Sequence, residues 1–288
     1  MTTVKIESTP MANHYEKRLI RVVDYIHDNP AGNLSLDTLA DVAALSRFHF
    51  HRMFRNQFGE TVTLTVRRVR LHLASVALVR GADPIERIAI SVGYPNLASF
   101  SRAFRELYSV TPAAFRKRGQ LCATPLSTTR KAIPMFPTEI RNSPARHIAA
   151  ITHKGAYFEI SRAFQKLSTT LAARDMFKHS GAMVAVFYDD PASTHVSDLR
   201  SHAGFEMATD VEVASPLEIV DLPGGRHAVL TFKGPYAGLP EAYDHLYGAW
   251  LRDAGETPAN SPSFEIYLNS PMDTAPDNLL TELHLPLA

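Results

Sequence analysis

The N-terminal part of the chain repeats itself at a spacing of 50 residues. The matched residues are Phe50, Arg52, Phe54 and Arg55 in the first copy and Phe100, Arg102, Phe104 and Arg105 in the second. Each copy follows a shorter apolar segment and a turn, and its aromatic residues recur at the spacing of one helix face. Two matched units of helix, turn and helix predict an all-α domain at the start of the chain.

Turn and capping signals set the bounds of the expected helices. A helix over 14–28 ends at the breaker pair Asn29-Pro30, and Ser35 is placed to cap a short helix over 36–43. Gly59 is typical of the residue that follows a helix end. The remaining helices are expected at about 47–58, 63–80, from 85, 96–108 and 111–118.

The two helices that follow the turns each have an apolar face and an arginine-bearing face. In the first, Phe50 and Phe54 lie together, while Phe48, Arg52 and Arg55 lie on the opposite side. Such a helix suits the major groove of DNA, where arginine reads guanine and an aromatic ring can contact a thymine methyl group. The alternative is a helical bundle whose arginines are merely solvated.

The net charge of +1 hides an uneven distribution. Residues 1–120 hold 17 Lys and Arg against 10 Asp and Glu, a net charge of +7, whereas residues 121–288 hold 13 against 19, a net charge of −6. Of the 17 basic residues in the first part, 14 are arginine, which suits planar phosphate and base recognition. The asymmetry favours two modules with different partners, although drift of surface charge would give the same totals.

The runs Leu34–Gly59 and Ile85–Arg116 resemble the signature of the AraC/XylS family of bacterial transcription regulators. The resemblance covers about residues 14–118 and implies seven helices, with two reading heads that enter successive major grooves. The DNA-binding residues that it implies are Arg47, Phe48, His51, Arg52 and Arg55 in the first head and Asn96, Ala98, Ser101, Arg102 and Arg105 in the second. Two departures are the missing proline near Val62 and the small size of Ala98. The second head is therefore expected to bind mainly through phosphates.

The C-terminal part is duplicated as well. The matched pairs include Arg146 with Arg226, His147 with His227, Tyr157 with Tyr236, and Tyr188 with Tyr267. Both pairs of tyrosines are 79 residues apart. The repeated unit reads as strand, loop, helix and strand, which predicts an α+β domain. Two copies would place two sheets or half-sheets about a pseudo-twofold axis, with a cleft between them.

Residues 137–288 resemble GyrI-like effector-binding domains, through GAYFEI at 155–160, GPYAGL at 234–239 and SFEIYLNSP at 263–271. The resemblance implies a glutamate at the centre of a ligand pocket, and Glu265 occupies that position. Alternation places Glu265 and Tyr267 on one strand face, and a carboxylate among aromatic rings attracts cationic or amphipathic organic molecules. The expected aromatic walls are Tyr157, Tyr188, Tyr236, Tyr267 and Trp250. The alternatives are an exposed strand carboxylate and, for Trp250, packing in the core.

The segment between the two parts is rich in Thr, Pro and Ser, which is typical of a linker. Four parts are therefore expected: a flexible N-terminus at 1–13, an AraC-type DNA-binding domain at 14–118, a linker at 119–136 and a GyrI-like domain at 137–288. The single cysteine, Cys122, excludes an internal disulfide framework.

The sequence contains no run that could span a bilayer and no signal peptide, so a cytoplasmic protein without a membrane partner is expected. Common zinc, nucleotide and hydrolase motifs are absent, so no metal, cofactor or catalytic residue is expected. The expected partners are promoter DNA, a small-molecule effector and, through the family resemblance, RNA polymerase. A monomer with two heads covers adjacent grooves, so a monomer or a weak dimer suffices.

The leading interpretation is a bacterial transcription regulator that senses a small molecule. Two other functions stay open. One is a GyrI-like hydrolase or drug-sequestering protein with a DNA-binding appendage. The other is a constitutive DNA-binding protein whose C-terminal domain recruits a protein partner.

Overall fold

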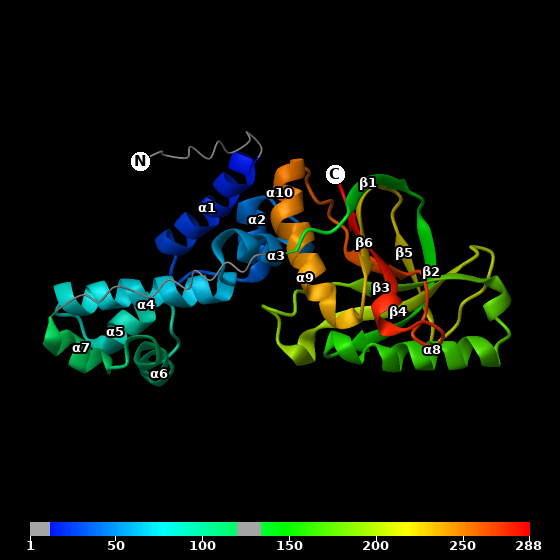
Figure 1. The fold of residues 1–288 in the computed structure, drawn as a ribbon. Coiled ribbons are helices and arrows are strands. Elements are labelled where there is room, and N and C mark those ends of the chain that lie inside the picture. The colour runs from blue at the N-terminus through cyan, green and yellow to red at the C-terminus, as the bar shows by residue number, and fades with distance from the viewer. Residues whose placement is uncertain (1–11, 120–133) are drawn as a thin grey trace.

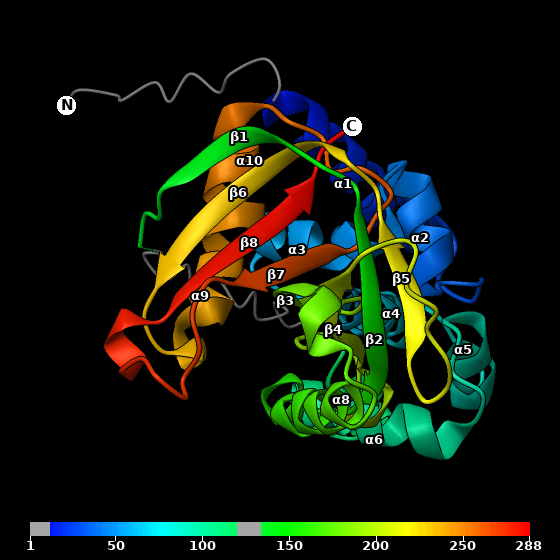
Figure 2. The same cartoon turned by 90° about the vertical axis from the view of Figure 1, so that its right-hand side faces the viewer.

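The computed structural model describes residues 12–119 and 134–288. An all-helical N-terminal domain lies beside an α+β C-terminal domain, as Figures 1 and 2 show. The expected fold class is confirmed. The segments predicted as a flexible N-terminus, 1–13, and as a linker, 119–136, fall largely outside the described residues.

The described N-terminal domain consists of seven helices. They are α1 (Ala12–Asp28), α2 (Leu36–Ala43), α3 (Arg47–Phe58), α4 (Val62–Arg80), α5 (Ile85–Ser91), α6 (Leu97–Tyr108) and α7 (Pro112–Arg118). Ser35 and Ser46 cap α2 and α3 with their side chains. Gly59 follows α3 with a φ of +74°, a conformation that favours glycine.

The helix α4 joins two small helical heads, each built around its own copy of the repeated phenylalanines. Phe50 and Phe54 are fully buried in the first head, beside Leu19 and Ile26 of α1. Phe100 and Phe104 are fully buried in the second head, with Phe115 of α7 among their neighbours. The repeat therefore marks the core of each head, as its spacing predicts.

The C-terminal domain has a single antiparallel sheet of eight strands in the order β1-β6-β8-β7-β3-β4-β2-β5. The strands are β1 (Thr138–Ser143), β2 (Arg146–Lys154), β3 (Ser180–Phe187), β4 (Arg200–Met207), β5 (Glu218–Leu222), β6 (Gly225–Lys233), β7 (Ser263–Tyr267) and β8 (Leu280–Pro286). Its helices are α8 (Ser161–Ala173), α9 (Leu239–Asp244) and α10 (Leu251–Ala254). A π-helical stretch at His245–Trp250 joins the last two into one helix, called here the α9–α10 helix.

The strand order is symmetric about the pair β3 and β7. The strands β1 to β4 of the first repeat correspond to β5 to β8 of the second. Exchanging each strand for its counterpart gives the same order read from the other end of the sheet, so the pseudo-twofold axis passes between β3 and β7. The edge strands cross over, because β1 pairs with β6 of the second repeat and β5 pairs with β2 of the first. The two half-sheets are therefore joined into one continuous sheet.

Candidate ligand cavity and DNA-reading faces

The sheet places Glu265 in the space between two helices. Residues paired directly across the strands form one row on one sheet face, which reads Ile151, Ala203, Ala185, Glu265, Leu283 and Leu230. The α8 side chain Leu167 packs at one end of the row, on Ile151 and Ala203. The α9–α10 helix packs at the other end, on Leu283 and Leu230. Glu265 therefore lies in the uncovered middle of that face.

The Glu265 side chain is almost completely buried, with 3% of its surface exposed. Burial raises the pKa of Glu265 to about 7, because the charged form is poorly solvated there. The Tyr267 hydroxyl opposes this effect by donating a hydrogen bond of 2.8 Å to Oε2 of Glu265. A carboxyl group with this pKa can lose its proton readily when a cation arrives.

A cavity of about 1040 Å³ opens in front of Glu265. Its walls come from α8, β3, β7, the start of the α9–α10 helix and the loop that follows β3. Most of the surface is apolar, and the buried carboxyl groups of Glu265 and Asp190 are among the polar groups. A large apolar cavity with a few buried polar groups is the usual form of a site for a small organic molecule.

The structure brings together four of the six residues that the sequence assigns to the pocket. Glu265, Tyr157, Tyr236 and Tyr267 line the cavity. Tyr188 lies elsewhere, with its hydroxyl 2.9 Å from Nδ1 of His202 and its ring facing Phe48. Trp250 packs against the apolar core beneath the α9–α10 helix and does not line the cavity. The expected positions of Tyr188 and Trp250 are corrected accordingly.

Sequence reasoning missed Phe164 and Tyr243, which both line the cavity. They are equivalent positions of the C-terminal repeat, since Ala163-Phe164 matches Ala242-Tyr243. The sequence signal that could have identified them is this match, because equivalent aromatic residues on the two repeated helices face the same pseudo-twofold cleft. The same cavity is also lined by Arg52 and Arg55, which belong to the other domain.

Arg52 of α3 points into the C-terminal domain. Its guanidinium carbon lies 4.3 Å from the centre of the Tyr243 ring and 5.0 Å from that of Tyr247. Its Nη1 donates a hydrogen bond of 3.3 Å to Oγ of Ser263, and the residue is only 6% exposed. Burial alone would lower the pKa of Arg52, but Tyr247, Tyr243 and Asp190 together raise it. Arg52 is thus a buried cation in an aromatic setting.

The two histidines of α3 are also buried at this boundary. His49 Nδ1 lies 2.7 Å from the Tyr247 hydroxyl, and its Nε2 lies 2.9 Å from the carbonyl oxygen of Ser261. Burial lowers the pKa of His49 to about 3, so the neutral ring is held. His51 is 7% exposed, and burial lowers its pKa too.

Two other residues assigned to the first head, Arg55 and Phe48, also lie along this boundary. Nη2 of Arg55 pairs with Oδ1 of Asp244, and its Nη1 lies 4.0 Å from Oδ1 of Asp190. Arg47 is exposed and lies over the ring of Phe48, with 5.1 Å between the guanidinium carbon and the ring centre. Apart from Arg47, every residue of α3 is buried or half-buried.

The second head presents a different picture, since its assigned residues lie on an open face. Ala98, Arg102 and Arg105 are exposed, and Ser101 is half-buried. Asn96 caps α6, its Oδ1 accepting a hydrogen bond of 2.8 Å from the backbone N–H of Ser99. Figure 1 shows α5, α6 and α7 at the end of α4 that points away from the sheet. The two copies of the repeat therefore have unlike surroundings.

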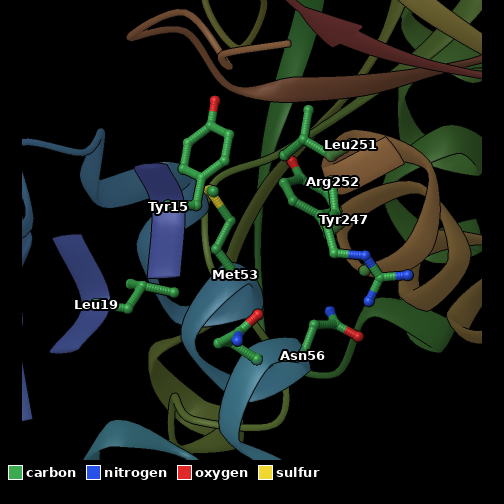
Figure 3. Close-up of a pocket in the computed structure, with 9 residues that line it drawn as sticks. Tyr15, Leu19, Met53, Asn56, Tyr247, Leu251 and Arg252 are labelled. Carbon is green, nitrogen blue, oxygen red and sulfur yellow. The ribbon is translucent and has the colours of Figure 1, made fainter. Parts of the chain in front are cut away.

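A second contact area joins α1 and α3 to the α9–α10 helix, as Figure 3 shows. Tyr15 of α1 donates a hydrogen bond of 2.8 Å to the Thr257 hydroxyl. Met53 of α3 packs in the apolar core of the C-terminal domain. A cavity of only about 30 Å³ is left between the domains at this point. The first head is therefore closely packed against the C-terminal domain.

Among residues 12–119 and 134–288, no three metal-ligating side chains cluster together. In the same part of the chain, no helix is long and apolar enough to cross a membrane.

Comparisons with known proteins match both domains. A model described as GyrI-like small molecule binding domain matches residues 136–288, and a helix-turn-helix domain model matches residues 39–118. Transcriptional regulator Rob of Salmonella typhimurium is 26% identical over 270 residues, 88% of this chain and 92% of Rob. The uncharacterized HTH-type regulator YbfP of Bacillus subtilis is 30% identical over 103 residues, only 36% of this chain and 35% of YbfP. The solved EcmrR–DNA complex covers 86% of this chain and 84% of that chain, at 15% identity and a TM-score of 0.45.

Proposed function

The chain belongs to the GyrI-like small-molecule-binding family and carries an AraC-type helix-turn-helix domain before it, and on that premise we propose a transcription regulator controlled by a small organic ligand. The observation that carries the proposal is the shared position of Arg52. This arginine belongs to the first DNA-reading helix and also lines the ligand cavity. One side chain therefore connects the two activities.

The DNA-binding part of the proposal rests on the two heads and on the charge of residues 1–120. Arginines on α3 and α6 supply the groups that contact phosphates and guanine. Promoter DNA is the proposed target, and RNA polymerase is the proposed protein partner. We propose that the protein acts as a monomer or weak dimer in the bacterial cytoplasm.

The ligand-binding part rests on Glu265 and the aromatic walls of its cavity. A buried carboxyl group beside Tyr236, Tyr243 and Tyr267 favours an organic cation with an apolar body, through charge and contacts with the ring faces. The proposed role of the C-terminal domain is sensing without chemical conversion.

Isothermal titration of the full chain with n-octylguanidinium tests the ligand class, with n-octanoate and n-octanol as the anionic and neutral comparisons. We expect saturable binding of the cation alone and a loss of about tenfold or more in Glu265→Gln, as for one lost charge contact. Glu282→Gln is the matched control, because Glu282 is a neighbouring sheet carboxyl that pairs with Arg141 instead. Equal binding of octanoate, or unchanged binding by Glu265→Gln, would overturn the assignment.

The rival hydrolase activity is tested with p-nitrophenyl octanoate. We expect no turnover above the rate in buffer. Turnover that Glu265→Gln abolishes would favour the enzyme. DNA binding is tested by gel shifts at several salt concentrations, where unspecific binding that is unchanged by Arg102→Ala would contradict a sequence-specific regulator.

A further inference from the structure

Arg52 is surrounded by the groups that would hold a cationic ligand. It lies on the faces of Tyr243 and Tyr247, and it lines the same cavity as Glu265 and Asp190. Rings and acidic groups around a cation are the usual arrangement in sites for guanidinium and quaternary ammonium ligands. The protein's own first DNA-reading helix therefore places a guanidinium group, that of Arg52, in the ligand cavity.

Some buried polar atoms around Arg52 have no hydrogen-bond partner. Asp190 is 4% exposed and lines the cavity, yet its Oδ2 has no hydrogen-bond partner. The hydroxyl group of Tyr236 is likewise buried without a hydrogen-bond partner. Buried polar atoms normally find partners, so these atoms mark places where a ligand can donate hydrogen bonds. Arg52 meets the site through ring contacts and a long hydrogen bond to Ser263, which a better-fitting cation can replace.

We propose that Arg52 is a built-in competitor for the cation site of the cavity, and that a cationic ligand displaces it and thereby releases α3 for DNA. The inference rests on the proposed function and adds the sign of regulation, since the ligand would increase DNA binding by the first head. In this arrangement, called the docked form, α3 cannot enter a groove, because Arg52 lies against Tyr243 and Tyr247 and Arg55 pairs with Asp244, all three on the α9–α10 helix. The docked form is therefore autoinhibited at the first head, while the second head stays open.

The boundary offers a direct way to fix the docked form. A Cβ atom at Gly248 would lie 3.5 Å from Cβ of Asn56, at the short end of the range for disulfides, about 3.5–4.5 Å. Asn56→Cys with Gly248→Cys, in a Cys122→Ser background, should therefore form a disulfide between α3 and the α9–α10 helix. The two single-cysteine chains, treated with the same oxidant, are the controls for folding and for oxidation elsewhere.

The first arm of the test measures DNA binding by the full-length double-cysteine protein. The target is a duplex selected from a random pool by the reduced protein. With n-octylguanidinium present to release the first head, we expect the oxidised protein to bind at least about tenfold more weakly than the reduced one, with recovery on adding dithiothreitol. Equal binding by the two forms would overturn the inference, because docking would then not hinder the first head.

The second arm follows the rate of disulfide formation in the reduced protein. We expect n-octylguanidinium to slow the reaction several-fold and n-octanol to leave it unchanged. In an Arg52→Ala version the cation should no longer slow it, since nothing remains to be displaced. If calorimetry detects octylguanidinium binding and the rate does not change, the competition is refuted while the proposed function stands. If octylguanidinium does not bind, both fail.

Discussion

The guanidinium carbon of Arg52 lies 4.3 Å from the centre of the Tyr243 ring, across the boundary between the two domains. Its counterpart in the repeat, Arg102, is exposed on α6. Sequence equivalence therefore does not give the two heads equal access to DNA. The difference arises because α1 and α3 of the first head pack against the α9–α10 helix.

The open face of the second head predicts the effect of Arg102→Ala. Because α6 is accessible in the docked form, the substitution should weaken binding to all sequences and reduce the salt dependence by about one phosphate contact. Fluorescence anisotropy over a range of salt concentrations measures both quantities. Arg162→Ala, an exposed arginine on α8, is the control and should change neither. An unchanged salt slope in Arg102→Ala would remove α6 from the interface with DNA.

The close approach at Gly248 predicts a variant that separates the domains. A Cβ atom there would lie 2.8 Å from Oδ1, 3.1 Å from Cγ and 3.5 Å from Cβ of Asn56. A leucine adds three more carbon atoms in this space, so Gly248→Leu should push α3 away from the α9–α10 helix. Overpacking of this kind costs about 1–3 kcal/mol, which disfavours docking. We expect tighter DNA binding, up to about tenfold, without added ligand. The double variant Asn56→Ala/Gly248→Leu makes room for the leucine, and a gain that persists in it would contradict this cause.

The buried carboxyl group of Glu265 predicts a pH dependence of stability. Its pKa is about 7 in the folded protein and close to the ordinary 4.5 in the unfolded chain. Between these values the folded state holds a proton that the unfolded state has released. The free energy of unfolding should therefore fall as pH rises through this window, by at most about 1.4 kcal/mol per pH unit. Urea unfolding of Glu265→Gln should lack this slope, and parallel profiles for the two proteins would contradict it.

His49 predicts a dependence of the opposite sign. Burial lowers its pKa to about 3, from an ordinary value of 6.5, so the unfolded chain takes up a proton first as the pH falls. Stability from this group is complete above pH 6.5 and declines on acidification towards the folded value. Because Glu265 acts in the other direction, the comparison is made in Glu265→Gln. Adding His49→Gln should reduce the loss of stability in acid, and an unchanged profile would count against a buried neutral His49.

Local signals in the sequence were sufficient for the helical domain. Ser35 and Gly59 stand where helix ends need a cap or a left-handed residue, and Phe50 and Phe54 recur at helical spacing around a core. The position of Glu265 followed from strand alternation, because a period of two residues fixes which face a side chain occupies.

The contact between the domains is not encoded by any repeating spacing of residues along the chain, and for this reason the sequence did not predict it. Arg52 and His51 are polar residues on a face that suits DNA, and only the tertiary arrangement buries them. Phe48 gave a partial signal, since an aromatic ring on a polar face needs a partner. In the docked form a ring neighbour of Phe48 in the C-terminal domain is Tyr188, with ring centres 6.4 Å apart.

Hydroxyl-radical footprinting on a duplex selected by the full-length protein tests the central claim most directly, because it reports each head separately. We predict that the protein alone protects the groove of one head. With n-octylguanidinium, the protection should extend to the next major groove, about one helical turn away. Protection of both grooves without the cation, and no change on adding it, would contradict a first head held by Arg52 in the ligand cavity.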